Sequence, residues 1–306
     1  MILYILLMSI RNILVIIFLI LLVIFTCVFY FADYRKQTGD EIMKTYIKNY
    51  KNFENSIIYN FESGTGGLGD YIKFFMMTLT YCMNNNIRFY YKINNTNIEK
   101  YIKPIYDEMN ITEEQISTLK NYKISVPRDW YIELGGETVE NSYYNYNVNL
   151  DKVFYFAESV KQNVNNILPL IPNNYISIHL RMGDDFLDDP SEYLDNDSRK
   201  FSEKKLHAFI KKNSDKKIIL LCDNTEKKTQ IKKMYDNVII ASSDIGHTGL
   251  ANKITPKQVL DTVTEFYILT NSNLIYSASN SGFSIVASKF KNAKFIRGFE
   301  WNEYRI

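Results

Sequence analysis

Short apolar runs alternate with helical patterns through the second half of the chain, and no other feature restricts the fold as strongly. We expect strands at Tyr175–Leu180, Lys217–Cys222, Asn237–Ala241, Leu274–Ala278 and Lys294–Arg297. A short, continuously apolar strand is buried on both faces, and strands that alternate with helices pair in parallel. The pattern therefore predicts an α/β fold with a C-terminal doubly wound parallel sheet, where ligands bind at the carboxyl ends of the strands.

The helix expected after Thr255 has strong start signals. Thr255 is placed to cap its N-terminus, Pro256 stands at the first helical position, and Gln258 completes a capping box. Apolar residues then follow at helical spacing: Val259, Leu260, Val263, Phe266 and Tyr267. We expect this face of the helix to pack on the sheet.

The first half has a similar beginning. Ser56–Phe61 is typical of a short strand, Glu62–Gly67 of a glycine-rich turn, and Ile87–Ile93 of the next strand. The helix expected from Leu68 has one apolar face: Leu68, Ile72, Phe75, Met76, Leu79 and Met83. The sequence therefore predicts an N-terminal α/β domain over residues 56–170 and a C-terminal domain over residues 171–306.

The N-terminus contains an apolar block without charge from Ile13 to Ala32. At about 1.5 Å per residue, a helix of this length crosses the roughly 30 Å hydrocarbon core of a bilayer. A cleaved signal peptide is the alternative, but Phe29-Tyr30-Phe31 lacks the small residues of a cleavage site. We expect a membrane anchor over residues 1–32 and a polar stem over residues 33–55.

Membrane orientation is harder to predict than the anchor itself. Arg11 lies on one side of the apolar block, and Arg35 and Lys36 lie on the other, so the positive-inside rule does not decide it. Sequons for N-glycosylation occur at Asn94, Asn110 and Asn196. We expect a single-pass glycoprotein of type II, with a lumenal catalytic domain.

The composition excludes several classes of protein. Lys and Arg (36) nearly balance Asp and Glu (34), and no basic stripe with interleaved aromatics appears, which argues against a nucleic-acid partner. The 24 Tyr and 19 Phe residues supply a large core, which argues against disorder. Outside the apolar block only Cys82 and Cys222 remain, too few for a disulfide framework.

The segment from Ile178 to Asp184 ends a predicted strand in polar and charged residues. Arg181 suits a diphosphate there, because its planar guanidinium can donate two parallel hydrogen bonds and stabilise charge on a leaving nucleoside diphosphate. A purely structural interpretation is equally open: a surface ion pair of Arg181 with Asp184, and His179 packed against the sheet.

The segment from Ser279 to Ser284 follows another predicted strand and precedes a helical stretch at Ile285–Lys289. Backbone N–H groups and small hydroxyls at a helix N-terminus can hold a phosphate. Ordinary capping of the helix by Ser281 or Ser284 is the alternative.

Taken together, these motifs resemble those of the GT-B fucosyltransferase superfamily, which includes α-1,2-, α-1,6- and protein O-fucosyltransferases. His-x-Arg-x-Gly-Asp follows a strand, Ser-Asn-Ser-Gly-Phe-Ser comes about a hundred residues later, and Gly66–Tyr71 is similar to the Gly-Gly-Leu-Gly-Asn-Gln segment of the α-1,2 branch. The resemblance implies two Rossmann-type domains. It also implies inverting, metal-independent transfer of fucose from GDP-fucose to a hydroxyl of a glycan or glycoprotein.

The resemblance also implies roles for individual residues. Arg181 would contact the β-phosphate and act in catalysis, with His179 and Asp223 at the nucleotide. The remaining donor-site residues would be Gly183, Asp184, Ser281, Gly282, Phe283 and Ser284, with Gly66, Gly67 and Gly69 shaping the cleft. For the catalytic base, Asp189 is favoured among the acids of one loop, Asp184, Asp185, Asp188, Asp189 and Glu192. No cofactor and no metal are expected.

Three departures from the family pattern leave the branch and acceptor open. Met182 stands where many members have a second Arg, Asp70-Tyr71 where the α-1,2 branch has Asn-Gln, and Gly282 where Thr is common. These departures motivate an alternative, a membrane-tethered, non-catalytic carbohydrate-binding or structural glycoprotein with a degenerate transferase fold.

Two other enzyme classes fit the sequence less well. A metal-dependent transferase would hold Mn²⁺ or Mg²⁺ with Asp-x-Asp, and Asp195-Asn196-Asp197 has that spacing but follows no convincing strand. His207 and His247 add no metal-site spacing. A membrane kinase or nucleotide triphosphatase is disfavoured, because no Gly-x-x-x-x-Gly-Lys-Ser/Thr occurs and the glycine segment lacks the required Lys.

Overall fold

The structure is a computed structural model of the chain. It describes residues 15–27, 41–62, 64–94, 97–128, 131–139, 148–168, 170, 172–182, 201–246, 248–249, 254–291 and 293–299. The chain divides into two compact units. The first contains Met1–Asn49 and Tyr146–Val148, and the second contains Tyr50–Asn145 and Asn149–Ile306. We describe each unit by itself.

The N-terminal unit corrects one prediction. Its described helices cover residues 15–27 and 41–49. Within the part of the chain that the structure describes, no helix has both the length and the apolar character needed to cross a membrane. The predicted transmembrane helix, and with it the predicted single-pass membrane location, is therefore wrong.

The second unit begins with a five-stranded sheet in the order β2-β1-β4-β5-β6. Its strands are β1 (Ser56–Glu62), β2 (Arg88–Asn94), β4 (Tyr122–Pro127), β5 (Ile132–Leu134) and β6 (Glu137–Val139). β1 pairs in parallel with β2 and β4, whereas β5 and β6 are antiparallel. The connections into β5 and β6 are too short for a parallel crossover. The first sheet is thus mixed rather than wholly parallel.

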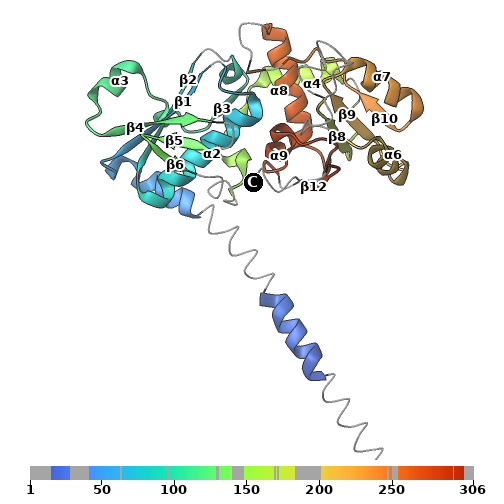
Figure 1. The fold of residues 1–306 in the computed structure, drawn as a ribbon, viewed down its shortest axis with the longest axis horizontal. Coiled ribbons are helices and arrows are strands. Elements are labelled where there is room, and N and C mark those ends of the chain that lie inside the picture. Colours follow the sequence, from blue (N-terminus) through green and yellow to red (C-terminus); the bar gives the residue numbers. More distant parts are fainter. Residues whose placement is uncertain are drawn as a thin grey trace, which may run out of the picture. The chain divides into compact units, whose positions relative to one another are not determined.

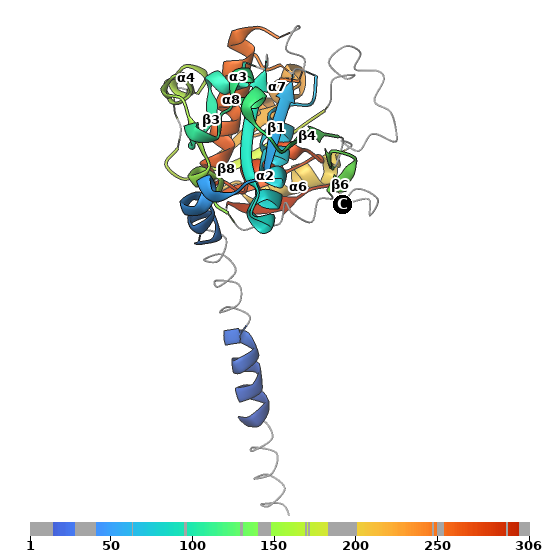
Figure 2. The ribbon, with the colours of Figure 1, turned by 90° about the vertical axis from the view of Figure 1, so that its left-hand side faces the viewer.

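Helix α2 (Leu68–Asn85) lies beside β1 in the ribbon of Figure 2. It packs on β1 and β2 through aromatic side chains. The Phe75 ring lies 4.9 Å from both the Phe89 and the Phe154 ring centroids. Tyr59 and Tyr71 are fully buried beside it. The apolar face that the sequence predicted for this helix is buried along its whole length.

Short elements complete this half of the unit. They are η1 (Tyr50–Asn52), η2 (Ile98–Lys100), β3 (Ile102–Pro104), η3 (Asp107–Met109), α3 (Glu113–Thr118), η5 (Leu150–Lys152), β7 (Phe154–Phe156) and α4 (Glu158–Ile167). β3 and β7 form an antiparallel pair. The predicted domain boundary between residues 170 and 171 stays a prediction.

The second sheet has five strands, all parallel, in the order β10-β9-β8-β11-β12. They are β8 (Ile176–Leu180), β9 (Ile218–Cys222), β10 (Val238–Ile240), β11 (Leu274–Ser277) and β12 (Lys294–Arg297). Each lies where the sequence predicted a strand. The chain leaves the central strand β8 toward β9 and later continues from its other side at β11, so the order reverses beside β8. Doubly wound sheets bind ligands at such a reversal.

The helices described between these strands are labelled in Figure 1. They are α6 (Glu203–Lys212), α7 (Thr225–Met234), α8 (Pro256–Thr270) and α9 (Gly282–Ala287). The predicted capping box of α8 is present: the Thr255 hydroxyl accepts from the Gln258 N–H, and Pro256 opens the helix. Helix α9 begins earlier than predicted, with Ser281 rather than Ser284 at its N-cap.

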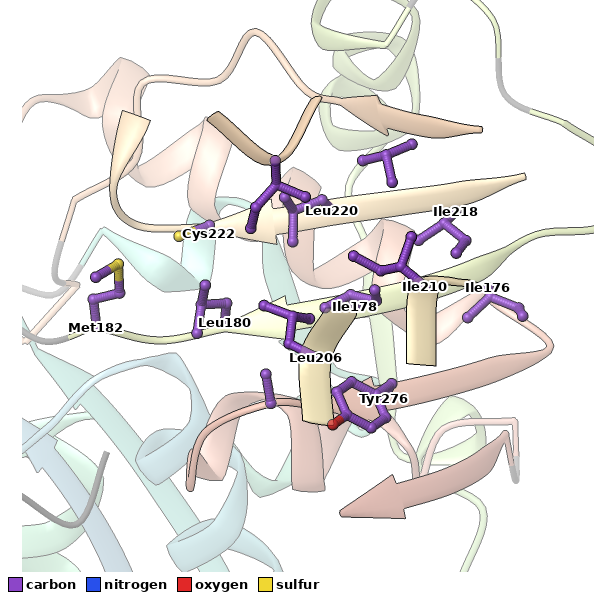
Figure 3. Close-up of a cluster of buried hydrophobic side chains, with 13 residues drawn as sticks. Ile176, Ile178, Leu180, Met182, Leu206, Ile210, Ile218, Leu220, Cys222 and Tyr276 are labelled. Carbon is purple, nitrogen blue, oxygen red and sulfur yellow. The ribbon is translucent and has the colours of Figure 1, made fainter. Parts of the chain in front are cut away.

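One face of the second sheet is closed by an apolar cluster (Figure 3). Ile176, Ile178 and Leu180 of β8 pack there with Leu206 and Ile210 of α6. Side chains alternate between the two faces of a strand. Residues 177, 179 and 181 therefore point to the opposite face, so the apolar core directs His179 and Arg181 away from itself.

Candidate active site

A cavity of about 170 Å³ lies at the carboxyl ends of β8 and β9. Its lining residues come from the half of the second unit that contains the first sheet and from the half that contains the second sheet. The lining residues are Gly67, Leu68, Gly69, Asp70, His179, Arg181, Cys222, Asp223, Ile245, Gly246, Thr248, Thr262, Glu265, Ser281, Gly282 and Phe283. The sequence-predicted residues that meet there are Gly67, Gly69, His179, Arg181, Asp223, Ser281, Gly282 and Phe283.

Arg181 and Asp223 become neighbours through the register of their strands. Leu180 pairs with Cys222, so the residue after each strand leaves the sheet at the same edge. Arg181 Nη1 forms an ion pair with Asp223 Oδ2, and Asp223 Oδ1 accepts a hydrogen bond of 2.8 Å from the Met182 N–H. The Asp223 side chain is only 4% exposed. This buried carboxylate holds the guanidinium in one orientation at the cavity wall.

The Arg181 backbone is fixed as well. Its N–H donates a hydrogen bond of 2.8 Å to Ser279 Oγ, which joins the end of β8 to the segment after β11. The predicted structural alternative paired Arg181 with Asp184, but Asp184 lies outside the described residues. Among the described residues, the partner of Arg181 at this edge is on the neighbouring strand.

His179 is a buried, neutral imidazole at the same wall. Burial, with the nearby Arg181 charge, lowers the pKa of His179 to about 3. Its ring stacks on Phe283 with a centroid distance of 5.2 Å and an interplanar angle of 22°. Among the described residues, Nδ1 is buried without a hydrogen-bond partner. A buried polar nitrogen without a partner is rare, and in a cavity it indicates a place for a ligand or water atom.

Part of the segment from Ser279 to Ser284 lines the cavity, and another part is buried behind the lining residues. Ser281, Gly282 and Phe283 line the cavity, whereas Ser284 is fully buried behind them. The Ser284 and Ser277 hydroxyls lie 2.6 Å apart. Ser281 makes no side-chain capping bond, so the capping alternative does not explain its hydroxyl. Ser284 thus holds the loop in place, and Ser281 to Phe283 form the wall.

The glycines bring the two halves of this unit into contact. A Cβ on Gly69 would lie 2.8 Å from the Phe283 backbone nitrogen, so only glycine lets α2 approach α9 this closely. Gly66 has a φ of +147°, and a Cβ there would lie 2.7 Å from Asp70. Gly66 therefore permits the backbone conformation of the turn before α2, whereas Gly67 and Gly69 line the cavity.

Sequence reasoning missed Glu265, a buried carboxylate of α8 that lines the cavity. Burial raises the pKa of Glu265 to about 7, although the buried Lys228 and a hydrogen bond from Ser243 Oγ oppose the shift. Asp261, Thr262 and Glu265 form a polar stripe at helical spacing within an otherwise apolar helix. That stripe was the signal in the sequence. Thr248, Thr262, Ile245 and Gly246 were also missed.

Several predicted residues cannot be placed. Gly183, Asp184 and Asp189, the acid loop and Asp195-Asn196-Asp197 lie outside the described residues, as does His247. His207 lies on α6, where Nδ1 is 2.8 Å from the Tyr235 hydroxyl. Within the described part of the chain, no group of three or more potential metal ligands exists.

Comparison with known proteins gives similarity of structure only. No family model and no curated protein matches the sequence. The Bradyrhizobium α-1,6-fucosyltransferase NodZ, soaked with GDP-fucose, is 11% identical with a TM-score of 0.48, over 78% of this chain and 92% of that chain. POFUT1 in complex with GDP-fucose is 8% identical with a TM-score of 0.47, over 80% and 98%.

A third similar structure is a variant of Arabidopsis thaliana FUT1 in complex with GDP, 13% identical with a TM-score of 0.46, over 86% of this chain and 76% of that chain. All three are fucosyltransferases, the kind of protein that the sequence motifs predicted. Similarity at this level carries no argument about activity. What the chain does has to follow from its own residues.

Proposed function

We propose that this chain is a fucosyltransferase, which transfers fucose from GDP-fucose to a hydroxyl of a glycan or glycoprotein with inversion and without a metal ion. The observation that carries the proposal is Arg181, whose guanidinium is oriented by the buried Asp223 at a cavity beside the strand-order reversal. A fixed guanidinium there can stabilise the negative charge that grows on a leaving nucleoside diphosphate. Metal-dependent transferases use a metal ion for this role.

The segment before α9 supports the same ligand. Ser281, Gly282 and Phe283 line the cavity beside His179 and Arg181, and a serine hydroxyl with backbone N–H groups at the start of a helix can hold a phosphate. Neutral His179 offers Nδ1 as a further hydrogen-bonding atom in this wall.

Glu265 supports guanine as the base. A carboxylate can accept two parallel hydrogen bonds from the adjacent N1–H and N2–H groups of guanine. Uracil has one N–H, between two carbonyl groups that a carboxylate repels. Because the two donors of guanine favour the ionised form, we expect GDP to bind Glu265 as the carboxylate.

The experiment is a calorimetric titration of the full-length protein with GDP, GDP-fucose and UDP, with and without EDTA. Selective binding of the GDP ligands that is insensitive to EDTA supports the proposal. Preference for UDP, or a requirement for metal, contradicts it. Turnover of GDP-fucose is measured in parallel, because binding without turnover would indicate the non-catalytic alternative.

The matched variants are Arg181→Lys and Arg128→Ala. Arg181→Lys keeps a cation beside Asp223 but loses the planar fork, and we expect turnover to fall about a hundredfold or more. Arg128 forms an exposed ion pair with Glu133, outside the cavity lining, so its removal serves as the control. Unchanged turnover in folded Arg181→Lys would refute the role of Arg181.

A further inference from the structure

Three carboxylates of the described residues line the cavity, and only one is open to solvent. Asp223 is 4% exposed and is held by Arg181 and the Met182 N–H. Glu265 is 3% exposed and accepts from the Ser243 hydroxyl. The Asp70 side chain is 38% exposed. Among the described cavity residues, Asp70 is therefore the acid that can meet an incoming acceptor and return a proton to water.

Asp70 is held in one orientation. Its Oδ2 accepts a hydrogen bond of 3.2 Å from the Gly67 N–H, and its Oδ1 accepts one of 2.8 Å from Lys73 Nζ. Lys73 Nζ in turn lies 4.1 Å from the centroid of the Phe74 ring. A carboxylate has about four lone-pair sites, so Asp70 can accept a further hydrogen bond without losing either contact.

Asp70 and Arg181 belong to different walls of one cavity. Asp70 lies in the first turn of α2, and Arg181 follows β8 of the second sheet. An inverting displacement needs groups on two sides of the sugar, because the acceptor attacks from the side opposite the leaving group. The group that takes the acceptor proton and the group that stabilises the diphosphate must then come from opposite sides.

We infer that Asp70 is the general base of the transfer, an inference that rests on the proposed function. The acceptor oxygen bonds to C1 of fucose as its O–H proton moves to a carboxylate oxygen of Asp70. The bond between C1 and the β-phosphate oxygen breaks, and its electron pair leaves with GDP beside Arg181. Asp70 then returns the proton to solvent.

A purely structural role for Asp70 predicts different behaviour. As a cap, Asp70 needs only an oxygen that accepts from the Gly67 N–H, which Asn also supplies. As a base, it needs a carboxylate, which Asn lacks. Asp70→Asn therefore keeps the cap and removes the base. Glu62→Gln is the matched control, since Glu62 also lies close to the start of α2 but outside the cavity lining.

The experiment measures GDP release from GDP-fucose by the full-length protein, with water as the acceptor hydroxyl and separately with azide. Water must lose a proton on attack, whereas azide is an anion and needs no base. For Asp70→Asn we expect hydrolysis to fall by about 10²–10⁴-fold, transfer to azide to stay close to the wild-type rate, and GDP affinity to be unchanged. Glu62→Gln should behave as the wild type in all three.

Three results would overturn the inference. Hydrolysis by Asp70→Asn at the wild-type rate would move the base elsewhere, with the predicted Asp189 as the next residue to test. Equal loss with water and azide would indicate distortion of the site by a lost cap. A wild-type protein that binds GDP-fucose without turnover, or fails to bind it, would remove the proposed function and this inference with it.

Discussion

The backbone N–H of Leu68 donates a hydrogen bond of 2.8 Å to Thr248 Oγ1, across 180 residues of sequence. Leu68 is the first residue of α2, whose N-cap is Gly67 and has no side chain to offer. Thr248, in the segment that follows β10, supplies the missing cap and is itself 3% exposed. The start of α2, one wall of the cavity, is thus stabilised by a residue that also lines the cavity.

Thr248→Val is expected to lower the free energy of unfolding by about 1–2 kcal/mol, because the Leu68 N–H loses its acceptor in a buried setting. GDP affinity should fall with it, because Thr248 lines the cavity and holds one of its walls in place. Urea unfolding and GDP titration measure the two effects. Thr248→Ser keeps the hydroxyl and is the control. A Val variant as stable as the Ser variant would show that the bond contributes nothing.

Gly69→Ala should destabilise the protein by about 1–3 kcal/mol, the usual range for overpacking. Its Cβ would meet the Phe283 N and the Gly282 carbonyl carbon at 2.8 and 2.9 Å, both backbone atoms that cannot rotate away. Gly282→Ala is the matched control for stability, because a Cβ there meets nothing within 4 Å. Equal unfolding midpoints for the two variants would contradict the close contact of α2 with α9.

The fold of the C-terminal half could be predicted because its strands are short apolar runs between helices with local start signals, as at Thr255 and Pro256. Strands β5 and β6 of the first sheet could not. β5 and β6 have three residues each, too few for an alternating pattern to stand out. Their pairing depends on tight turns, such as Gly135 with a φ of +57° and Gly136 with a φ of +94°.

The residues of the candidate site also differ in whether the sequence predicts them. Arg181 and Asp223 directly follow predicted strands, and Ser281 comes shortly after a third, so parallel pairing brings them to one edge of the sheet. Thr248 and Glu265 reach the cavity through packing between distant segments, which a strand-by-strand interpretation does not reveal. The membrane span predicted over Ile13–Ala32 depended on length and hydropathy alone, and no helix in the described part of the chain has both the length and the apolar character to cross a membrane.

Glu265 makes stability depend on pH. Burial raises its pKa from 4.5 to about 7, so the folded state holds the proton more tightly than the unfolded state. The resulting stability is present below about pH 4.5 and is lost as the pH rises through 7. Gln cannot ionise, so Glu265→Gln removes this loss. The free energy of unfolding of the variant, relative to that of the wild type, should therefore increase by about 2–3 kcal/mol from pH 5 to pH 8. Urea unfolding at both pH values measures the gain, and a constant difference between the two proteins would contradict the shift.

His179→Phe should separate stability from ligand binding. The stack on Phe283 is kept, and the buried Nδ1 that lacks a partner among the described residues is removed. An unsatisfied buried polar group costs about 1–3 kcal/mol, so the variant is expected to unfold at the same or a higher urea concentration than the wild type. GDP affinity should fall nevertheless, because the cavity loses a hydrogen-bonding atom. His207→Phe, a change of the same chemistry on α6, should leave GDP affinity as it was. If His179→Phe binds GDP as tightly as the wild type, Nδ1 has no ligand partner, and the histidine serves only to pack Phe283 against the sheet.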